Sequence, residues 1–275
     1  MKVSRAKLNA SHCLAAYRHN MDIILNLMTP TTFTVALTIG LFAGLVKGMV
    51  GFGMPMIMIS GMSTVLSPEL ALAGLILPTL ASNGMQAFRQ GIAAAWGSAC
   101  RFRLFLVVAG VVLVGSAQLV TVLPPAVLFL FIGVCVAGFA LMQLIGWQPK
   151  VSGDVPWIEA VVGAVAGFTG GLSGIWGPPT VAYLTATNTA KADQVRVQGV
   201  IYGLGAVALF FAHIQSGIIR AETIPFSFSL VIPAIIGMRL GFRYQDRIQQ
   251  ATFKRLTLCV LLIAGLNLIR RGLLG

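Results

Sequence analysis

The chain has 275 residues, of which 57% are hydrophobic and only 9% are charged, and its mean hydropathy is +0.90. Soluble proteins carry about 25% charged residues, so this composition excludes a soluble globular protein. The net charge is +12, but the basic residues gather in short loops between apolar segments, which indicates orientation in a membrane rather than nucleic-acid binding.

Residues 1–30 form a basic tail without an apolar core of signal-peptide length, and we expect a surface helix or a dispensable extension there. Apolar segments long enough to cross a bilayer then follow one another along the chain. They cover 31–66 (interrupted), 69–88, 104–122, 125–146, 157–187 (interrupted), 194–214, 226–243 and 252–269. This pattern predicts an all-α polytopic membrane protein.

The two interrupted segments repeat each other. Residues 40–55 read GLFAGLVKGMVGFGMP and residues 163–178 read GAVAGFTGGLSGIWGP. Four glycines and a proline match in one register: Gly40, Gly44, Gly48, Gly51 and Pro55 correspond to Gly163, Gly167, Gly171, Gly174 and Pro178. We therefore predict two homologous four-segment repeats, residues 31–146 and 157–275, joined by a polar linker at 147–156. Within each repeat, glycines at four-residue spacing predict close helix packing.

The first helix of each predicted repeat is interrupted by glycine and proline. Glycine permits backbone conformations that other residues avoid, and proline suits the first turn of a new helix. We expect helices to end near Gly51 and Gly174 and new ones to begin at Pro55 and Pro178. Uncapped helix N-termini attract anions, and paired broken helices are typical of a transporter's substrate site. The alternative is a pair of glycine-rich kinks that serve packing alone.

Polar residues near the breaks complete the candidate substrate site. Lys47 either supplies positive charge to an anion or extends its amine to the membrane surface. Asn83 and Gln86 on one segment, and Gln198 and Tyr202 on its equivalent, either face the substrate or join helices to each other. The candidate set is Lys47, Gly51, Gly53, Met54, Asn83, Gln86, Gly174, Trp176, Gly177, Pro178, Gln198 and Tyr202.

These motifs resemble those of the TauE/SafE sulfite exporter family of bacterial membrane proteins. The stretches GLFAGLVKGMVGFGMP and GAVAGFTGGLSGIWGPPTVAYL carry the resemblance, together with the four-plus-four segment pattern over residues 31–270. The resemblance implies transport of sulfite, organosulfonates or other small sulfur-containing anions across the bacterial inner (plasma) membrane. Phe52 and Met54 stand where the family often has glycine, so the size of the site and the identity of the anion stay open.

Two topologies fit the segments. If the interrupted segments span the membrane, the chain crosses eight times and the halves run parallel. If they are re-entrant, each half crosses three times and the halves are inverted. Among the loop lysines and arginines, inversion places ten inside against three outside, whereas eight crossings give 7 and 6. The positive-inside rule favours inverted repeats, although the four bases of the tail argue the other way.

The sequence holds no HExxH motif, no paired aspartates and no Cys/His cluster, so we expect neither an enzyme nor a metal or cofactor site. No carboxylate falls at the centre of an apolar segment. A facilitator without a coupling ion, a proton-coupled carrier and a sodium-coupled carrier are therefore all open. The direction of transport and the oligomeric state are open as well. A secondary transporter of small anions is the leading function, and a small-anion channel or a non-transporting scaffold is the alternative.

Overall fold

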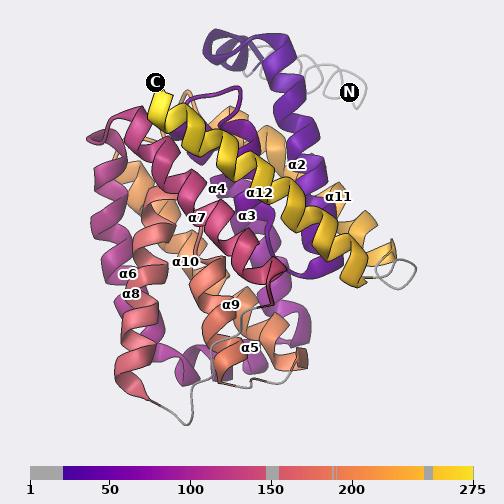
Figure 1. Ribbon diagram of the computed structural model, residues 1–275, viewed down its shortest axis with the longest axis vertical. Helices are drawn as coiled ribbons and strands as arrows, with labels where there is room; N and C mark the ends of the chain where they lie inside the picture. The colour runs from indigo at the N-terminus through magenta and orange to yellow at the C-terminus, as the bar shows by residue number, and fades with distance from the viewer. Residues whose placement is uncertain (1–20, 147–154, 188, 190, 245–249, 275) are drawn as a thin grey trace, which may run out of the picture.

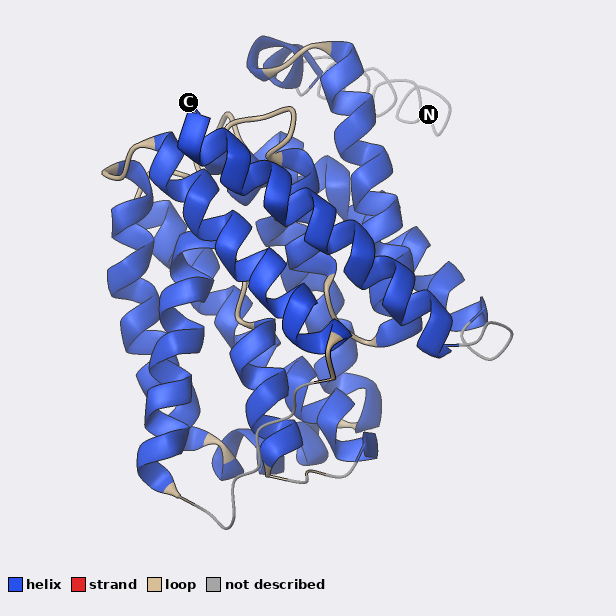
Figure 2. Cartoon of the chain, viewed as in Figure 1, coloured by secondary structure: helices blue, strands red, loops and turns tan. Residues whose placement is uncertain are grey.

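The computed structural model describes residues 21–146, 155–187, 189, 191–244 and 250–274. Its described part consists of helices and the turns and loops that join them, without a strand (Figure 2). The predicted all-helical class is therefore confirmed. Residues 1–20 of the predicted tail and residues 147–154 of the predicted linker lie outside the described residues.

Before the linker, the helices are α2 (Pro30–Val50), α3 (Met54–Met62), α4 (Pro68–Ala87), α5 (Ile92–Arg101), α6 (Arg103–Ala117) and α7 (Pro125–Leu144). After it come α8 (Pro156–Ser173), α9 (Gly177–Ala186), α10 (Lys191–Gln215), α11 (Ile224–Tyr244) and α12 (Gln250–Leu274). Short 3-10 turns follow α4 and α6. Proline occupies the first turn of many of these helices, where its missing N–H has no helical partner to lose.

In the described part of the chain, seven helices are long and apolar enough to cross a bilayer. They are α2, α4, α6 with its 3-10 extension, α7, α10, α11 and α12. This confirms a multi-pass membrane protein. The apolar pattern did not predict α5, a ten-residue helix that buries Ala95 and Ser98 while Ile92 and Trp96 are exposed. In Figure 1, α5 lies at the end of the molecule opposite the chain's C-terminus.

Small residues bring two pairs of helices into backbone contact. Gly44 of α2 lies against Ala234 of α11, and Gly167 of α8 lies against Ala109 of α6. A Cβ atom at any of Gly44, Gly48, Gly167 or Gly171 would meet backbone atoms of the neighbouring helix. The predicted packing role of these glycines is therefore confirmed. In both pairs, residue numbers rise together along the contact, so the two helices run parallel.

Two further pairs run antiparallel, and in each the partners are helices that the predicted repeat would make equivalent. In the α4–α10 pair, Asn83 meets Tyr202 while Gln86 meets Val195. In the α7–α12 pair, Gly133 lies against Gly265 and Ile269, whereas Gly272 lies against Ala126 and Leu130. The corresponding helices α2 and α8 enter from opposite ends of the molecule (Figure 1). Within each of these two pairs, the helices thus point in opposite directions.

A proline in α4 is compensated by α11. Pro78 has no N–H, so it leaves the carbonyl of Gly74 without its helical partner. The hydroxyl of Ser227 donates to that carbonyl at 3.2 Å and accepts from the backbone N–H of Leu77 at 3.2 Å. Because lipid offers no hydrogen bonds, Ser227 supplies hydrogen-bond partners for these backbone groups of α4 beside Pro78.

Candidate functional site

The first helix of each half ends at a glycine in the left-handed region of backbone conformation. Gly51 has φ 87° and closes α2 through its N–H to the carbonyl of Lys47. Gly174 has φ 70° and closes α8 through its N–H to the carbonyl of Gly170. The next helices begin at Met54 and Gly177, one residue before the prolines that were expected to start them. Two broken helices at matching positions are therefore present.

The helices that restart after the breaks have uncapped N-termini. Gly53 precedes α3 and Trp176 precedes α9, and neither residue supplies a side-chain cap to the first amides of its helix. The first turn of an uncapped helix carries free N–H groups and a partial positive charge of about half a unit. The helices α3 and α9 therefore begin with two electropositive ends next to the breaks.

Lys47 is the buried cation of this region. Its side chain lies one turn before the first break and is only 2% exposed. Its Nζ donates to the hydroxyl of Ser82 at 2.9 Å and to the Oδ1 of Asn83, both on α4. The alternative reading, in which the amine reaches the membrane surface, is therefore wrong. Burial of an ammonium is costly unless an anion or several dipoles compensate it.

One small cavity connects the two breaks. It has a volume of about 20 Å³, which is room for about one water molecule. Its polar lining comes from both halves of the chain, with Lys47 and Asn83 on one side and Tyr202 on the other. The Tyr202 hydroxyl donates to the carbonyl of Gly177 at 3.4 Å, and its ring lies 6.4 Å from that of Trp176. The cavity is narrow in this conformation.

The structure brings part of the predicted site together. The predicted residues that line this cavity are Lys47, Gly53, Asn83, Gly174, Trp176, Gly177 and Tyr202. The lining residues that sequence reasoning missed are Phe52, Pro55, Met56 and Ile175. They belong to the same two breaks, so the Gly/Pro motif itself was the signal that could have found them. Ser82 was also missed, although it lies one helical turn before Gln86.

The other predicted residues have different surroundings. Met54 is fully buried, Gln198 is buried, and Pro178 lines a separate apolar crevice beside α7. Gln86 joins helices, because its Nε2 donates to the carbonyl of Gly51 at 3.2 Å and to that of Val195 at 3.0 Å. Its Oε1 is buried without a hydrogen-bond partner. Gln86 thus ties the left-handed turn of Gly51 to α10.

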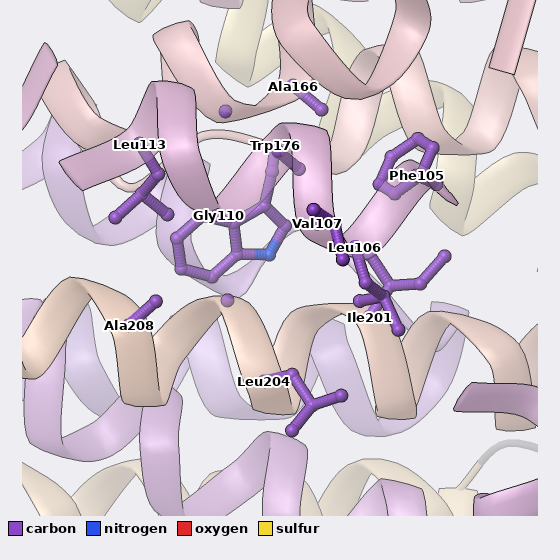
Figure 3. Close-up of a pocket in the computed structure, with 13 residues that line it drawn as sticks. Phe105, Leu106, Val107, Gly110, Leu113, Ala166, Trp176, Ile201, Leu204 and Ala208 are labelled. Atoms are coloured by element: carbon purple, nitrogen blue, oxygen red, sulfur yellow. The ribbon is translucent and has the colours of Figure 1, made fainter. Parts of the chain in front are cut away.

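Trp176 separates the small cavity from a larger apolar one. The larger cavity, about 240 Å³, lies between α6, α8 and α10, and its lining includes Gly110, Leu113 and Ala208. Figure 3 shows the indole lying across this space, between α6 and α10. The side chain is 4% exposed. Trp176 therefore forms a wall of the polar cavity.

His213 supports the second break from α10. Its ring is fully buried, with Nε2 3.1 Å from the carbonyl oxygen of Gly171 and Nδ1 2.9 Å from the hydroxyl of Ser216. Gly171 belongs to the last turn of α8, whose carbonyls lack helical partners. His213 thus satisfies a carbonyl that the break leaves free, which is a packed role and not a surface one.

The comparisons with known proteins agree with this architecture. The family model described as "Sulfite exporter TauE/SafE" matches residues 36–268, which is most of the chain and includes both breaks. No curated protein and no solved structure matches the chain. Members of this family are membrane transporters of sulfite and related anions. The chain belongs to the sulfite exporter TauE/SafE family.

Proposed function

We propose that this protein is a secondary transporter that moves small sulfur-containing anions, such as sulfite or an organosulfonate, across the bacterial inner membrane. The observation that carries the proposal is the meeting of Lys47 with both broken helices in one buried cavity. A tethered ammonium and two uncapped helix N-termini are all electropositive, so together they favour an anion. The Nδ2 of Asn83 donates one N–H to the Tyr202 carbonyl and has a second N–H that can donate to an oxygen atom of the anion.

The anion binds in this proposal between the two breaks. The amides at the start of α3 and α9 face its oxygens from opposite halves, and Lys47 approaches it from α2. Pro55 and Pro178 carry no N–H, so the free amides of these first turns come from neighbouring residues. In α3 one of them is Met56, whose N–H has no acceptor within the helix. Trp176 closes the site on the side of the apolar cavity.

We also propose that the two halves are inverted repeats with re-entrant first segments. The antiparallel contacts of α4 with α10 and of α7 with α12 support this, because parallel repeats would align equivalent helices in one direction. Inverted repeats allow the same site to open alternately to the two sides. The narrow cavity, with room for about one water molecule, favours such a carrier over a wide pore.

The test is counterflow in proteoliposomes. Vesicles loaded with unlabelled methanesulfonate should accumulate labelled methanesulfonate transiently above its equilibrium level, and sulfite should compete. Gly177→Leu should abolish this exchange, because the added side chain fills the cavity, whereas Gly177→Ala should retain it, since its Cβ would lie 3.7 Å from the Tyr202 hydroxyl.

Three other results would change the assignment. Flux without counterflow would indicate a small-anion channel. Full exchange in the Gly177→Leu variant would remove the site from the transport path. Flux of neither anion in correctly inserted protein would leave a non-transporting scaffold as the better interpretation.

A further inference from the structure

Lys47 has no anionic partner among the described residues. Its two hydrogen-bond acceptors, the Ser82 hydroxyl and the Asn83 amide oxygen, are both neutral. Two ion pairs of the described residues lie elsewhere and join Arg196 to Asp193 and Arg220 to Glu222. An ammonium in this position carries a buried and uncompensated charge whenever the cavity holds no anion.

The charged residues of the surrounding helices do not face Lys47. Apart from Lys47 itself, Tyr202 is the one titratable residue that lines the cavity. The α3 helix, which begins beside this cavity, has no titratable side chain. Other titratable groups lie away from the cavity. Glu69 opens α4, Asp193 and Arg196 pair near the start of α10, and the buried His213 of α10 contacts Gly171 and Ser216. Arg239 and Arg243 are exposed on α11, and Arg271 donates to the carbonyl of Ser63 beyond α3.

The hydrogen bonds of Lys47 suit an amine that gains and loses a proton. A neutral amine has two N–H donors, and the structure shows two acceptors, both on α4. An ammonium has a third donor. Because α4 already takes two donors, the third is available to an anion in the cavity that Lys47 lines. The same position of the Lys47 side chain therefore suits both the neutral amine and the ammonium.

The burial of Lys47 couples proton binding at its amine to anion binding in the cavity. A buried charge is strongly unfavourable unless it is paired, so an empty site favours the neutral amine. An anion beside Nζ reverses this preference, because it compensates the charge. Linkage between two ligands is reciprocal, so the proton must strengthen anion binding by the same factor by which the anion strengthens proton binding.

We propose that Lys47 is the proton-binding site of a proton-coupled anion carrier. The proposal rests on the proposed function, in which the anion occupies the cavity between the breaks. On the loading side, the amine lone pair of Lys47 takes a proton from water as the anion enters. On the releasing side, the anion leaves, the N–H bond breaks and the proton passes to water. One proton accompanies each anion, so transport of a monovalent sulfonate is electroneutral and follows the pH gradient.

The experiment measures protons taken up when methanesulfonate binds to the detergent-solubilised full-length protein. Methanesulfonate stays ionised around neutral pH, so it contributes no protons itself. Binding is followed by titration calorimetry, and proton uptake by repeating the titration in buffers of different ionisation enthalpy. The wild-type protein should take up about one proton for each anion bound at the pH values where the empty site is neutral.

Three variants locate the proton. Lys47→Met should lose the proton uptake together with most of the affinity. Lys47→Arg keeps a permanent charge, so it should bind methanesulfonate without taking up a proton. Asn83→Asp places a carboxylate at an existing contact of Lys47, so the amine should stay protonated and the anion should bind more weakly and without proton uptake.

The outcomes separate the two proposals. Binding of methanesulfonate to the wild type without proton uptake at any pH would overturn proton coupling and leave the anion site standing. Undiminished uptake in Lys47→Met would overturn Lys47 as the proton site. Absence of binding by the folded wild type would remove the anion site, and with it the proton coupling that depends on it.

Discussion

Close packing of α8 on α6 predicts opposite effects for two alanine substitutions. A Cβ on Gly167 would meet the backbone of Ala109, with the Cα of that residue at 2.9 Å and the carbonyl carbon at 3.0 Å. Backbone atoms cannot rotate away, so the two helices must separate. A Cβ on Gly115 of α6 meets nothing within 4 Å. Gly115→Ala therefore adds only the helix preference of alanine over glycine.

The magnitudes follow from the packing. Overpacking a well-packed contact costs about 1–3 kcal/mol, and we expect Gly167→Ala to lie in the upper part of this range because the obstacle is backbone. Gly115→Ala should stabilise by about 0.5–1 kcal/mol. At about 2–4 °C per kcal/mol for a chain of this size, thermal unfolding in detergent should lower the melting temperature of Gly167→Ala and raise that of Gly115→Ala. Equal melting temperatures for the two variants would refute the described α6–α8 contact.

Three further substitutions test the parts that hold the breaks. Gly174→Ala should destabilise the protein by about 1–2 kcal/mol, because φ at this position is 70° and a side chain there is strained; an unchanged melting temperature would contradict the left-handed turn. Ser227→Ala should cost about 1–3 kcal/mol, since it leaves the Gly74 carbonyl beside Pro78 unpaired; full stability would show that this carbonyl has another partner. His213→Ala should lower stability by a similar amount through the lost contact with Gly171; hydrogen exchange that stays unchanged in the second break would argue against that role.

The positions of the breaks could be predicted because they depend on local stereochemistry. Gly51 and Gly174 end their helices in a conformation that favours glycine. The second residue of the next helix can be proline, because an N–H at that position would have no helical acceptor. The matched glycines also predicted helix packing, because small residues at four-residue spacing lie on one face. Both inferences use information within one or two turns of the chain.

The partners of side chains could not be predicted in the same way. Lys47 is followed 35 residues later by Ser82, and only the crossing of α2 and α4 makes them neighbours. The alternative of a surface-directed lysine was therefore equally consistent with the sequence. Gln86 belongs to the predicted site, yet its side-chain amide joins Gly51 to Val195 and does not line the cavity.

Two other features depend on three-dimensional packing. A Cβ added to Gly170 of α8 or to Gly205 of α10 would meet the indole of Trp176. The absence of a side chain at these two glycines therefore leaves space for the indole. Those glycines have no common period in the sequence that would indicate a shared partner. The α5 helix was missed because its alternation of small and apolar residues is too short for a membrane span.

The most direct test of the central claim is to locate a bound anion. Crystals grown with bromomethanesulfonate would give an anomalous bromine signal from a heavy atom attached to the sulfonate group. We expect one dominant signal between Lys47 and the N-termini of α3 and α9, lost in crystals of Lys47→Met. A dominant signal elsewhere in the protein, or the same signal in the Lys47→Met crystals, would contradict an anion site built from the two broken helices and the buried lysine.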